Sequence, residues 1–526
     1  MRTTRGLLIA ATASALLLAG CSSAGTTDSA RDISEVTAGL IDDSDSAEGV
    51  QGGTISYAPF SGVSTLDPVR QDGGSTGGSQ MAAIYDLLVR YDSASDEYVP
   101  QLAAGLEPND DASVWTLALR DGVTFSDGAP VDAESVRWSV ERYLTNRGTH
   151  AQLWSSAVER IDVVDPLTAR IVLTKPWPQF PALLAAGPGM IVAPSSMATG
   201  TFRPIGAGPF TVADFQPGTA LTLAARDDYW GGAPPLDTLR FPVITSEDGR
   251  LDALRNGDID AAYMRSPDVV ADALNTEDAG YLYNANMGAV LAVNQRPGRA
   301  AADPLVRRAI VAAVDPDLFD DRANKGKGMP ESAMFGQWSR WGPTETAGYD
   351  PNLARQLLAD AKAGGYDGTL TYVGLNAAYA QSHALAIQSM LEAVGFTVEL
   401  DFKPSMADLI AALYAKHDFD IGESGFNVAD EAPYVRLFSN LHSGSSSNVL
   451  GVESPEADRL LDRLQTADGD EARQSALDEL QSWVNAEAPF AALGATKNLV
   501  AWRGVTDVVP SADGIMLFGD AARTEG

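Results

Sequence analysis

The chain has 526 residues, of which 37 are lysine or arginine and 70 are aspartate or glutamate, so its formal net charge at pH 7 is −33. Nucleic-acid phosphates are bound by clustered basic side chains, and a chain this acidic without a local basic run is not a nucleic-acid-binding protein. A single cysteine excludes a disulfide framework, and four histidines leave few ligands for a transition-metal site. An apolar share of 45% predicts a folded protein, and the length predicts two or three lobes.

Residues 1–20 have the pattern of an export signal. Arg2 and Arg5 precede an apolar run that is too short for a membrane-spanning helix, and small residues come directly before Cys21. The segment Leu18-Ala19-Gly20-Cys21 resembles the bacterial lipobox, so we predict a lipoprotein signal peptide and a lipid anchor on Cys21. The alternative is an ordinary secretory peptide with a chance cysteine.

Residues 21–50 predict a flexible tether. They are rich in Ser, Ala, Thr, Gly and acidic residues and contain few large apolar side chains, so they bury too little surface to offset the entropy of ordering. We expect the folded body to begin near Gly52.

From there to about residue 290, short strand-like runs alternate with turns and a few helices. Residues 114–119 predict a strand, and Asp132 predicts the cap of a helix with one apolar face. Residues 161–164 and 169–173 flank Asp165-Pro166 as a hairpin. The pattern is typical of a mixed α and β lobe with much antiparallel pairing.

Long helices separate the strands between residues 291 and 488. Strands are predicted near 369–373, 396–400 and 419–422, with helices at 382–394 and 406–414 between them. Right-handed crossovers make such strands parallel, and a ligand crevice lies beyond their carboxyl ends. The residues that follow the third strand, 422–430, are therefore expected at a crevice.

No pattern of an active site is present. Gly422-Glu423-Ser424-Gly425 lacks the final glycine of a serine-hydrolase elbow, because Phe426 occupies that position. There is no His-Glu-x-x-His sequence, and Cys21 is the only cysteine, so we expect no catalytic residue, no metal and no cofactor. An exported hydrolase, such as a glycosidase or a peptidase, remains the alternative, since two carboxylates can face each other across a cleft without any sequence motif.

The order of the motifs resembles that of the bacterial extracellular solute-binding proteins of family 5, the peptide- and nickel-binding class that serves ABC importers. The most specific piece is Trp115–Gly128, continued by Val131–Val136. Further pieces occur in the same order, among them Leu66-Asp67-Pro68, Ile84–Leu88, Gly206–Phe210, Gly257–Asp260 and Ser454–Asp458. The resemblance covers about residues 52–510.

The resemblance implies an α/β fold of two lobes, the type II periplasmic-binding-protein fold with an enlarged N-terminal lobe. Lobe I comprises residues 51–290 and 489–526, and lobe II comprises residues 291–488. It further implies a monomer at the extracytoplasmic face of the cell membrane, anchored through Cys21. The lobes close on a peptide or other small solute, and an ABC permease and ATPase complex receives it.

The resemblance also suggests ligand-binding residues in lobe II. In peptide-binding relatives, an aspartate shortly after a Gly-aromatic strand end binds the peptide's amino group. The matching segment in this chain is Gly425-Phe426-Asn427, followed by Asp430-Glu431. Asp430 and Glu431 are both candidates. With Glu423, they would form a pocket that favours a positively charged or amine-bearing group, because an unpaired buried carboxylate is costly. An oligopeptide is the first choice, with a nickel complex or a sugar as alternatives.

Lobe I supplies the remaining candidates. The loop Ser61-Gly62-Val63 matches a segment that offers backbone groups to extended peptides, and Tyr263-Met264 would lie on the hinge side. Trp154 is a candidate aromatic wall of the pocket, since ligand sites favour rigid apolar surfaces.

Overall fold

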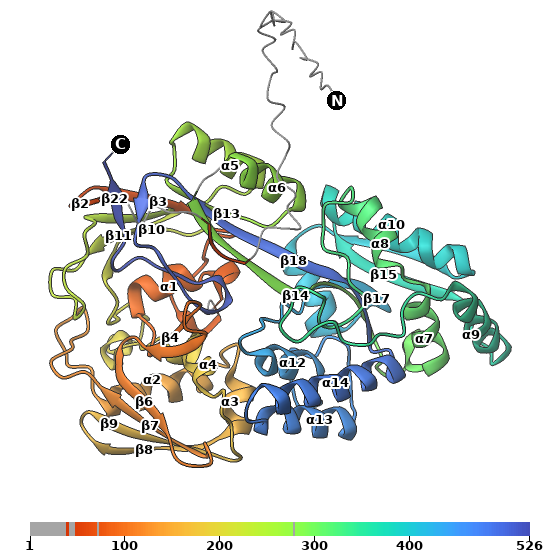
Figure 1. Ribbon diagram of the computed structural model, residues 1–526, viewed down its shortest axis with the longest axis horizontal. Coiled ribbons are helices and arrows are strands. Elements are labelled where there is room, and N and C mark those ends of the chain that lie inside the picture. Colours follow the sequence, from red (N-terminus) through yellow and green to blue (C-terminus); the bar gives the residue numbers. More distant parts are fainter. Residues whose placement is uncertain (1–37, 42–47, 71–72, 277–278, 526) are drawn as a thin grey trace, which may run out of the picture.

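The computed structural model describes residues 38–41, 48–70, 73–276 and 279–525. The predicted signal peptide and Cys21 lie outside these residues. The chain forms two lobes that are joined by long strands (Figure 1). Within the described ranges, no helix has the length and apolar character needed to cross a membrane.

One large mixed sheet runs through both lobes, in the order β10-β11-β12-β3-β13-β18-β14-β17-β15-β16. Its strands are β3 (Thr54–Ala58), β10 (Phe210–Gln216), β11 (Ala220–Ala225), β12 (Thr238–Pro242), β13 (Ala261–Met264), β14 (Ala279–Val293), β15 (Thr369–Leu375), β16 (Thr397–Lys403), β17 (Ile421–Ser424) and β18 (Phe490–Trp502). The antiparallel pair β14 and β18 passes from one lobe to the other (Figure 1), and its register shifts near Ala285 and Ala289. Residues 490–502 form one continuous strand that returns from lobe II to lobe I.

Lobe I adds a second layer below this sheet. A four-stranded antiparallel sheet consists of β6 (Ala103–Pro108), β7 (Val114–Leu119), β9 (Thr168–Leu173) and β8 (Val158–Asp165). Helices α2 (Ala133–Thr145), α3 (Ala151–Ala157) and α4 (Pro181–Leu184) accompany it, and α1 (Gly78–Tyr85), α5 (Glu247–Asn256) and α6 (Pro267–Thr276) belong to the upper part of the lobe (Figure 1). The predicted cap of α2 is confirmed, because the Asp132 side chain accepts a hydrogen bond from the Ser135 backbone N–H at 2.8 Å.

Lobe II contains the predicted parallel strands. β15 pairs in parallel with both β16 and β17, and α10 (Ala378–Val394) and α11 (Met406–Ile410) make the crossovers. The other helices are α7 (Pro304–Ala313), α8 (Pro316–Ala323), α9 (Pro351–Ala363), α12 (Pro433–Leu441), α13 (Pro455–Thr466) and α14 (Asp470–Glu487). The prediction of a βαβαβ unit is confirmed.

The expected tether contains two short strands. β1 (Gly39–Ile41) pairs with β14, and β2 (Gly49–Val50) pairs with β22 (Ala522–Thr524) near the C-terminus. For these residues the prediction of a tether is wrong: Leu40-Ile41 is a short apolar run that adds to the edge of the sheet, where Ile41 packs against the core. The remainder of the predicted tether, apart from residues 38 and 48, lies outside the described residues.

Candidate functional site

The segment after β17 is fixed to the strands that join the lobes. The Phe426 side chain is 1% exposed and packs against Phe490, with ring centroids 5.0 Å apart. The backbone N–H of Phe426 donates to Met287 O at 2.9 Å, and a Cβ added to Gly425 would lie 2.7 Å from Gly288 O. Asn427 follows in the left-handed region with φ of 51°. Gly425 and the Phe426 side chain therefore position the segment, and the Phe426 ring belongs to the core.

The carboxylate of Asp430 accepts its hydrogen bonds from other parts of the protein. Its carboxylate accepts hydrogen bonds from Asn286 Nδ2 at 2.8 Å, Ser339 Oγ at 2.6 Å and the Arg340 backbone N–H at 3.1 Å. Its backbone oxygen accepts a further bond from Trp341 Nε1 at 2.8 Å. Asp430 thus ties the segment to β14 and to the loop at residues 339–341.

Glu431 is in a different situation. Burial raises the pKa of its carboxyl group to about 7; the negative charges of Asp513 and Asp430 act in the same direction, and Arg340 opposes them. No lysine or arginine of the described chain forms an ion pair with Glu431, because Arg340 binds Asp96 and Arg436 binds Asp513. The Glu431 carboxyl group is therefore partly buried and has no cationic partner among the residues that the structure describes.

The surroundings of Glu431 come from both lobes. Its charge raises the pKa of three tyrosines of lobe I, Tyr91, Tyr98 and Tyr281, whose pKa values are raised mainly by burial. Tyr91 and Tyr98 lie on the hairpin of β4 (Val89–Asp92) and β5 (Glu97–Pro100), with ring centroids 5.4 Å apart. Aromatic rings close to a carboxylate are typical of sites that hold organic cations.

Glu423, the last acidic candidate, already has a partner. Its Oε1 lies 2.7 Å from Nδ1 of His383 on α10. Burial alone would lower the pKa of His383, but the hydrogen bond and the charge of Glu423 outweigh it, so the pKa is raised. Glu423 and Glu431 are thus chemically distinct sites.

In lobe I the loop 61–63 exposes only its first residue. Ser61 Oγ donates to Ser75 O at 3.1 Å, and Ser61 O accepts from Gln80 Nε2 at 3.4 Å. The Val63 side chain is buried, and a Cβ at Gly62 would lie 2.5 Å from Val243 Cγ2. The loop therefore offers Ser61 and backbone groups, while its other side chains are in the core.

Two further candidates, Met264 and Trp154, are core residues. Met264 is fully buried in the core, so its side chain is not exposed toward the space between the lobes. Trp154 is 3% exposed and packs against Phe180 at 5.8 Å, so it is not a wall of the cleft. Tyr263 is also buried, yet its hydroxyl reaches the joining strands and donates to Asn498 Oδ1 at 2.7 Å. Sequence alone does not separate such aromatic core positions from pocket walls.

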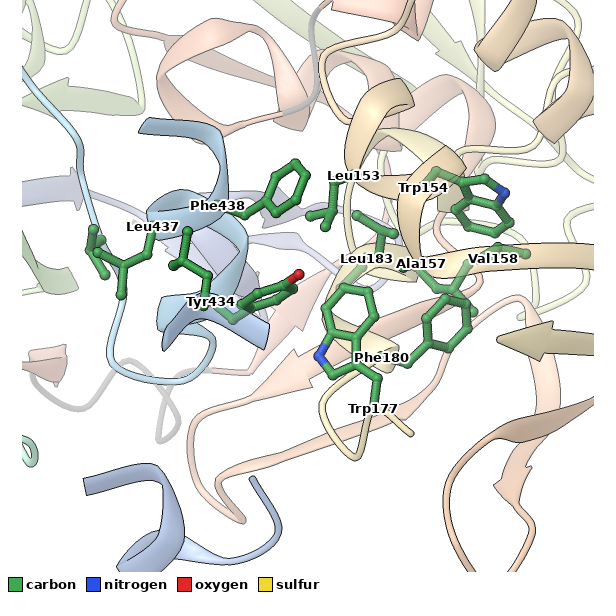
Figure 2. Close-up of a cluster of buried hydrophobic side chains, with 14 of the residues drawn as sticks. Leu153, Trp154, Ala157, Val158, Trp177, Phe180, Leu183, Tyr434, Leu437 and Phe438 are labelled. Atoms are coloured by element: carbon green, nitrogen blue, oxygen red, sulfur yellow. The ribbon is translucent and has the colours of Figure 1, made fainter. Parts of the chain in front are cut away.

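The lobes touch through an apolar contact below the joining strands. Figure 2 shows Tyr434, Leu437 and Phe438 of α12 on one side and side chains of α3, α4 and the preceding loop on the other. Trp177 and Tyr434 meet edge to face, with ring centroids 5.2 Å apart. Five ion pairs also join the lobes: Lys175–Asp462, Lys325–Asp268, Lys327–Asp268, Arg340–Asp96 and Arg436–Asp513. The two lobes are therefore in direct contact.

The residues that sequence reasoning missed are those that surround Glu431 from lobe I: Tyr91, Tyr98, Tyr281 and Asp513. They lie more than 140 positions away in the sequence or near the C-terminus, and no local pattern marks them. Among the described residues, no group of three or more histidine, cysteine, aspartate or glutamate side chains is arranged to hold a metal ion.

Comparison with known proteins identifies the family that this chain matches. The family model of bacterial extracellular solute-binding proteins, family 5, matches residues 97–448. Protein XP55 of Streptomyces lividans is 27% identical over 461 residues, which are 80% of this chain and 81% of that protein. The dipeptide-binding protein of Escherichia coli K12 is 24% identical over 60% of this chain and 64% of its own length.

A solved structure agrees with the fold. The periplasmic binding protein AgaA from A. tumefaciens R10, in complex with agropinic acid, superposes with a TM-score of 0.76 at 25% identity, and the match covers 90% of this chain and 99% of that one. The predicted α/β fold of two lobes is confirmed.

Proposed function

This chain belongs to the bacterial extracellular solute-binding proteins of family 5, and from that premise we propose that it is the lipid-anchored receptor of an ABC importer, which captures an amine-bearing, peptide-like solute. Members of the family are extracytoplasmic binding proteins of transport systems and not enzymes, so the alternative of an exported hydrolase is set aside. The lipid is carried by Cys21, and the closed form delivers its solute to the permease.

The unpaired carboxylate of Glu431 carries the proposal. A buried anion is costly unless a cation or several hydrogen-bond donors accompany it, and this burial raises the pKa of Glu431 to about 7. An ammonium group between Glu431 and the rings of Tyr91, Tyr98 and Tyr281 would offset the cost of burying this carboxylate. Since Asp430 accepts three hydrogen bonds from the protein, Glu431 is the better candidate for the ligand's amino group.

The solute is expected between the lobes, because Glu431 belongs to lobe II and the tyrosines belong to lobe I. A ligand that touches both lobes stabilises the closed form by its differential affinity for that form. No catalytic step is needed for this function.

The test compares a tripeptide mixture with free amino ends and the same mixture after N-acetylation, using native mass spectrometry. The wild-type protein should retain the free mixture and reject the acetylated one. Glu431→Gln should lose most of the retention, by analogy with truncated charge pairs that cost about 2–5 kcal/mol. Glu471→Gln, which changes an exposed glutamate on α14, is the matched control and should behave as the wild type. Equal retention of both mixtures by the wild-type protein would refute the amine contact.

A further inference from the structure

An ion pair between Arg340 and Asp96 joins the two lobes. Asp96 ends the turn between β4 and β5 in lobe I, and Arg340 belongs to the loop at residues 339–341 in lobe II. The guanidinium binds the carboxylate with both of its Nη atoms: Nη2 donates to Oδ1 at 2.7 Å, and Nη1 donates to Oδ2. Because a two-point contact fixes direction as well as distance, it orients the lobes more strictly than a single contact would.

On the lobe I side, the pair includes Tyr91, one of the tyrosines that surround Glu431. The Tyr91 hydroxyl donates to Asp96 Oδ1 at 2.5 Å and lies 3.5 Å from Arg340 Nη2. Tyr91 is 7% exposed, and its ring packs against Tyr98, which lies opposite it in the hairpin. The hydrogen bonds from Arg340 are the main reason why the pKa of the Asp96 carboxyl is lowered. Asp96 thus connects Arg340 of lobe II with a tyrosine close to Glu431.

On the lobe II side, the loop at residues 339–341 binds Asp430. The Arg340 backbone N–H donates to Asp430 Oδ2 at 3.1 Å, and Ser339 Oγ donates to Oδ1 at 2.6 Å. Trp341 Nε1 donates to the Asp430 backbone oxygen at 2.8 Å. One short loop therefore contacts lobe I through the Arg340 side chain and contacts Asp430 through three further groups.

Glu431, the next residue, lies at the boundary between the lobes. Its backbone oxygen accepts a hydrogen bond at 3.0 Å from Nε2 of Gln179, which precedes α4 in lobe I. The loop at 339–341 is itself well packed, because Trp341 is 3% exposed and its backbone oxygen accepts from Gln474 of α14 at 3.0 Å. A loop that is packed and hydrogen-bonded in this way transmits a displacement instead of absorbing it.

We propose that the ion pair of Arg340 and Asp96 is a latch that couples the contact between the lobes to the position of Glu431. The inference rests on the proposed function, in which Glu431 binds the amine, and it makes Arg340 a positioning residue that acts without touching the solute. When the pair forms, the loop places Glu431 opposite Tyr91. The pair and the solute favour the same arrangement of the lobes, so each strengthens the other.

Asp96→Asn tests the latch without altering the turn. Asp96 has a φ of 58°, a conformation that asparagine also adopts, so the change removes the charge and keeps the backbone. Hydrogen–deuterium exchange is measured by mass spectrometry on the ligand-free full chain. Amides at 339–341 and 426–430 should exchange about 2-fold to 5-fold faster, the range for a partly exposed ion pair. Arg340→Ala should act alike, and Arg340→Lys, which keeps the charge and loses the second contact point, should lie between.

Asp462→Asn is the matched control. It removes the pair of Lys175 and Asp462, which also joins the lobes and has side chains of similar exposure. Exchange in both segments should match the wild type, because Asp462 lies on α13 and not on the loop of the latch. Thermal unfolding of each variant verifies the fold.

Titrations with unmodified tripeptides measure the effect on binding. At low salt, Asp96→Asn should bind about 2-fold to 5-fold more weakly than the wild type. The difference should shrink at high salt, because salt screens an exposed pair. In a Glu431→Gln background, Asp96→Asn should have little further effect on affinity, because the latch acts through Glu431.

The outcomes separate this inference from the proposed function. Exchange in Asp96→Asn that matches the wild type in both segments, or exchange in Asp462→Asn that rises as much, would refute the latch. Faster exchange with unchanged tripeptide affinity would refute the positioning role of Arg340. If Glu431→Gln binds tripeptides as tightly as the wild type, the role of Glu431 in the proposed function is refuted, while faster exchange in Asp96→Asn still supports the coupling of the segment to lobe I.

Discussion

Asp430 and Glu431 are neighbours in the sequence and carry the same charge, yet their surroundings give them different roles. Asp430 is surrounded by donors from β14 and the loop at 339–341, while Glu431 faces tyrosines and another carboxylate. The sequence pattern could indicate the segment, because it follows a parallel strand at the crevice edge. It could not choose between the two acids, since their partners come from other parts of the chain.

Asp430→Ala should therefore reduce stability. The change removes the acceptor of Ser339 and one of the two acceptors of Asn286, which still donates to Val428 O, and each buried group that loses its partner costs about 1–3 kcal/mol. Urea unfolding measures the loss, and Asp430→Asn, which retains one acceptor oxygen, should be closer to the wild type. A variant Asp430→Ala with unchanged stability and lost peptide retention would instead place Asp430 in the ligand site.

The raised pKa of Glu431 predicts a pH dependence of binding. The ionised carboxylate is the form that attracts an ammonium group, and burial holds its pKa at about 7. Affinity for a free-amine peptide should therefore fall as the pH drops through about 7, because the carboxyl group must first release its proton. Titrations that follow tryptophan fluorescence on both sides of pH 7 measure this. Glu431→Gln should bind the peptide weakly and should no longer lose affinity as the pH drops through about 7. A pH profile in that variant that matches the wild type would contradict the assignment.

At the scale of elements, local signals were sufficient for the parallel strands of lobe II, for the helices between them and for the capped helix α2. The alternation of strands and helices determines the parallel pairing of β15, β16 and β17, since right-handed crossovers leave no other simple arrangement. The two strands in the expected tether were missed because β1 and β2 are stabilised by pairing with β14 and β22, more than 200 positions away.

The apolar contact of α12 with α3 and α4 gives a prediction for lobe closure. Trp177 is buried at this contact, and Trp177→Ala should cost about 3–5 kcal/mol of stability and loosen the ligand-free closed form. Small-angle X-ray scattering should then give a larger radius of gyration without ligand and a smaller change on adding peptide. Trp115→Ala, in the core of lobe I, is the control that should lower stability alone. Scattering of Trp177→Ala that matches the wild type would show that this contact does not hold the lobes together.

At the scale of the whole molecule, the proposed anchor is separable from the binding site. Cys21→Ala should release the protein from the membrane into the soluble fraction, because the lipid on this residue is the proposed attachment. Its affinity for the tripeptide mixture should match that of the anchored form, and Ser22→Ala should stay membrane-bound. Fractionation followed by native mass spectrometry measures both properties. Protein that sediments with membranes despite Cys21→Ala would argue for another attachment.

The position of β18 in the sheet has a consequence for how the chain acquires its structure. β18 is among the last strands to be synthesised, yet it lies between β13 and β14 and is the hydrogen-bonded neighbour of both. Until residues 490–502 are available, β14 and all of lobe II have no hydrogen-bonded link to the sheet of lobe I. Such distant pairing makes folding slow and late. For a member of an extracytoplasmic family, the sheet that joins the two lobes can therefore be completed only after nearly the whole chain is available.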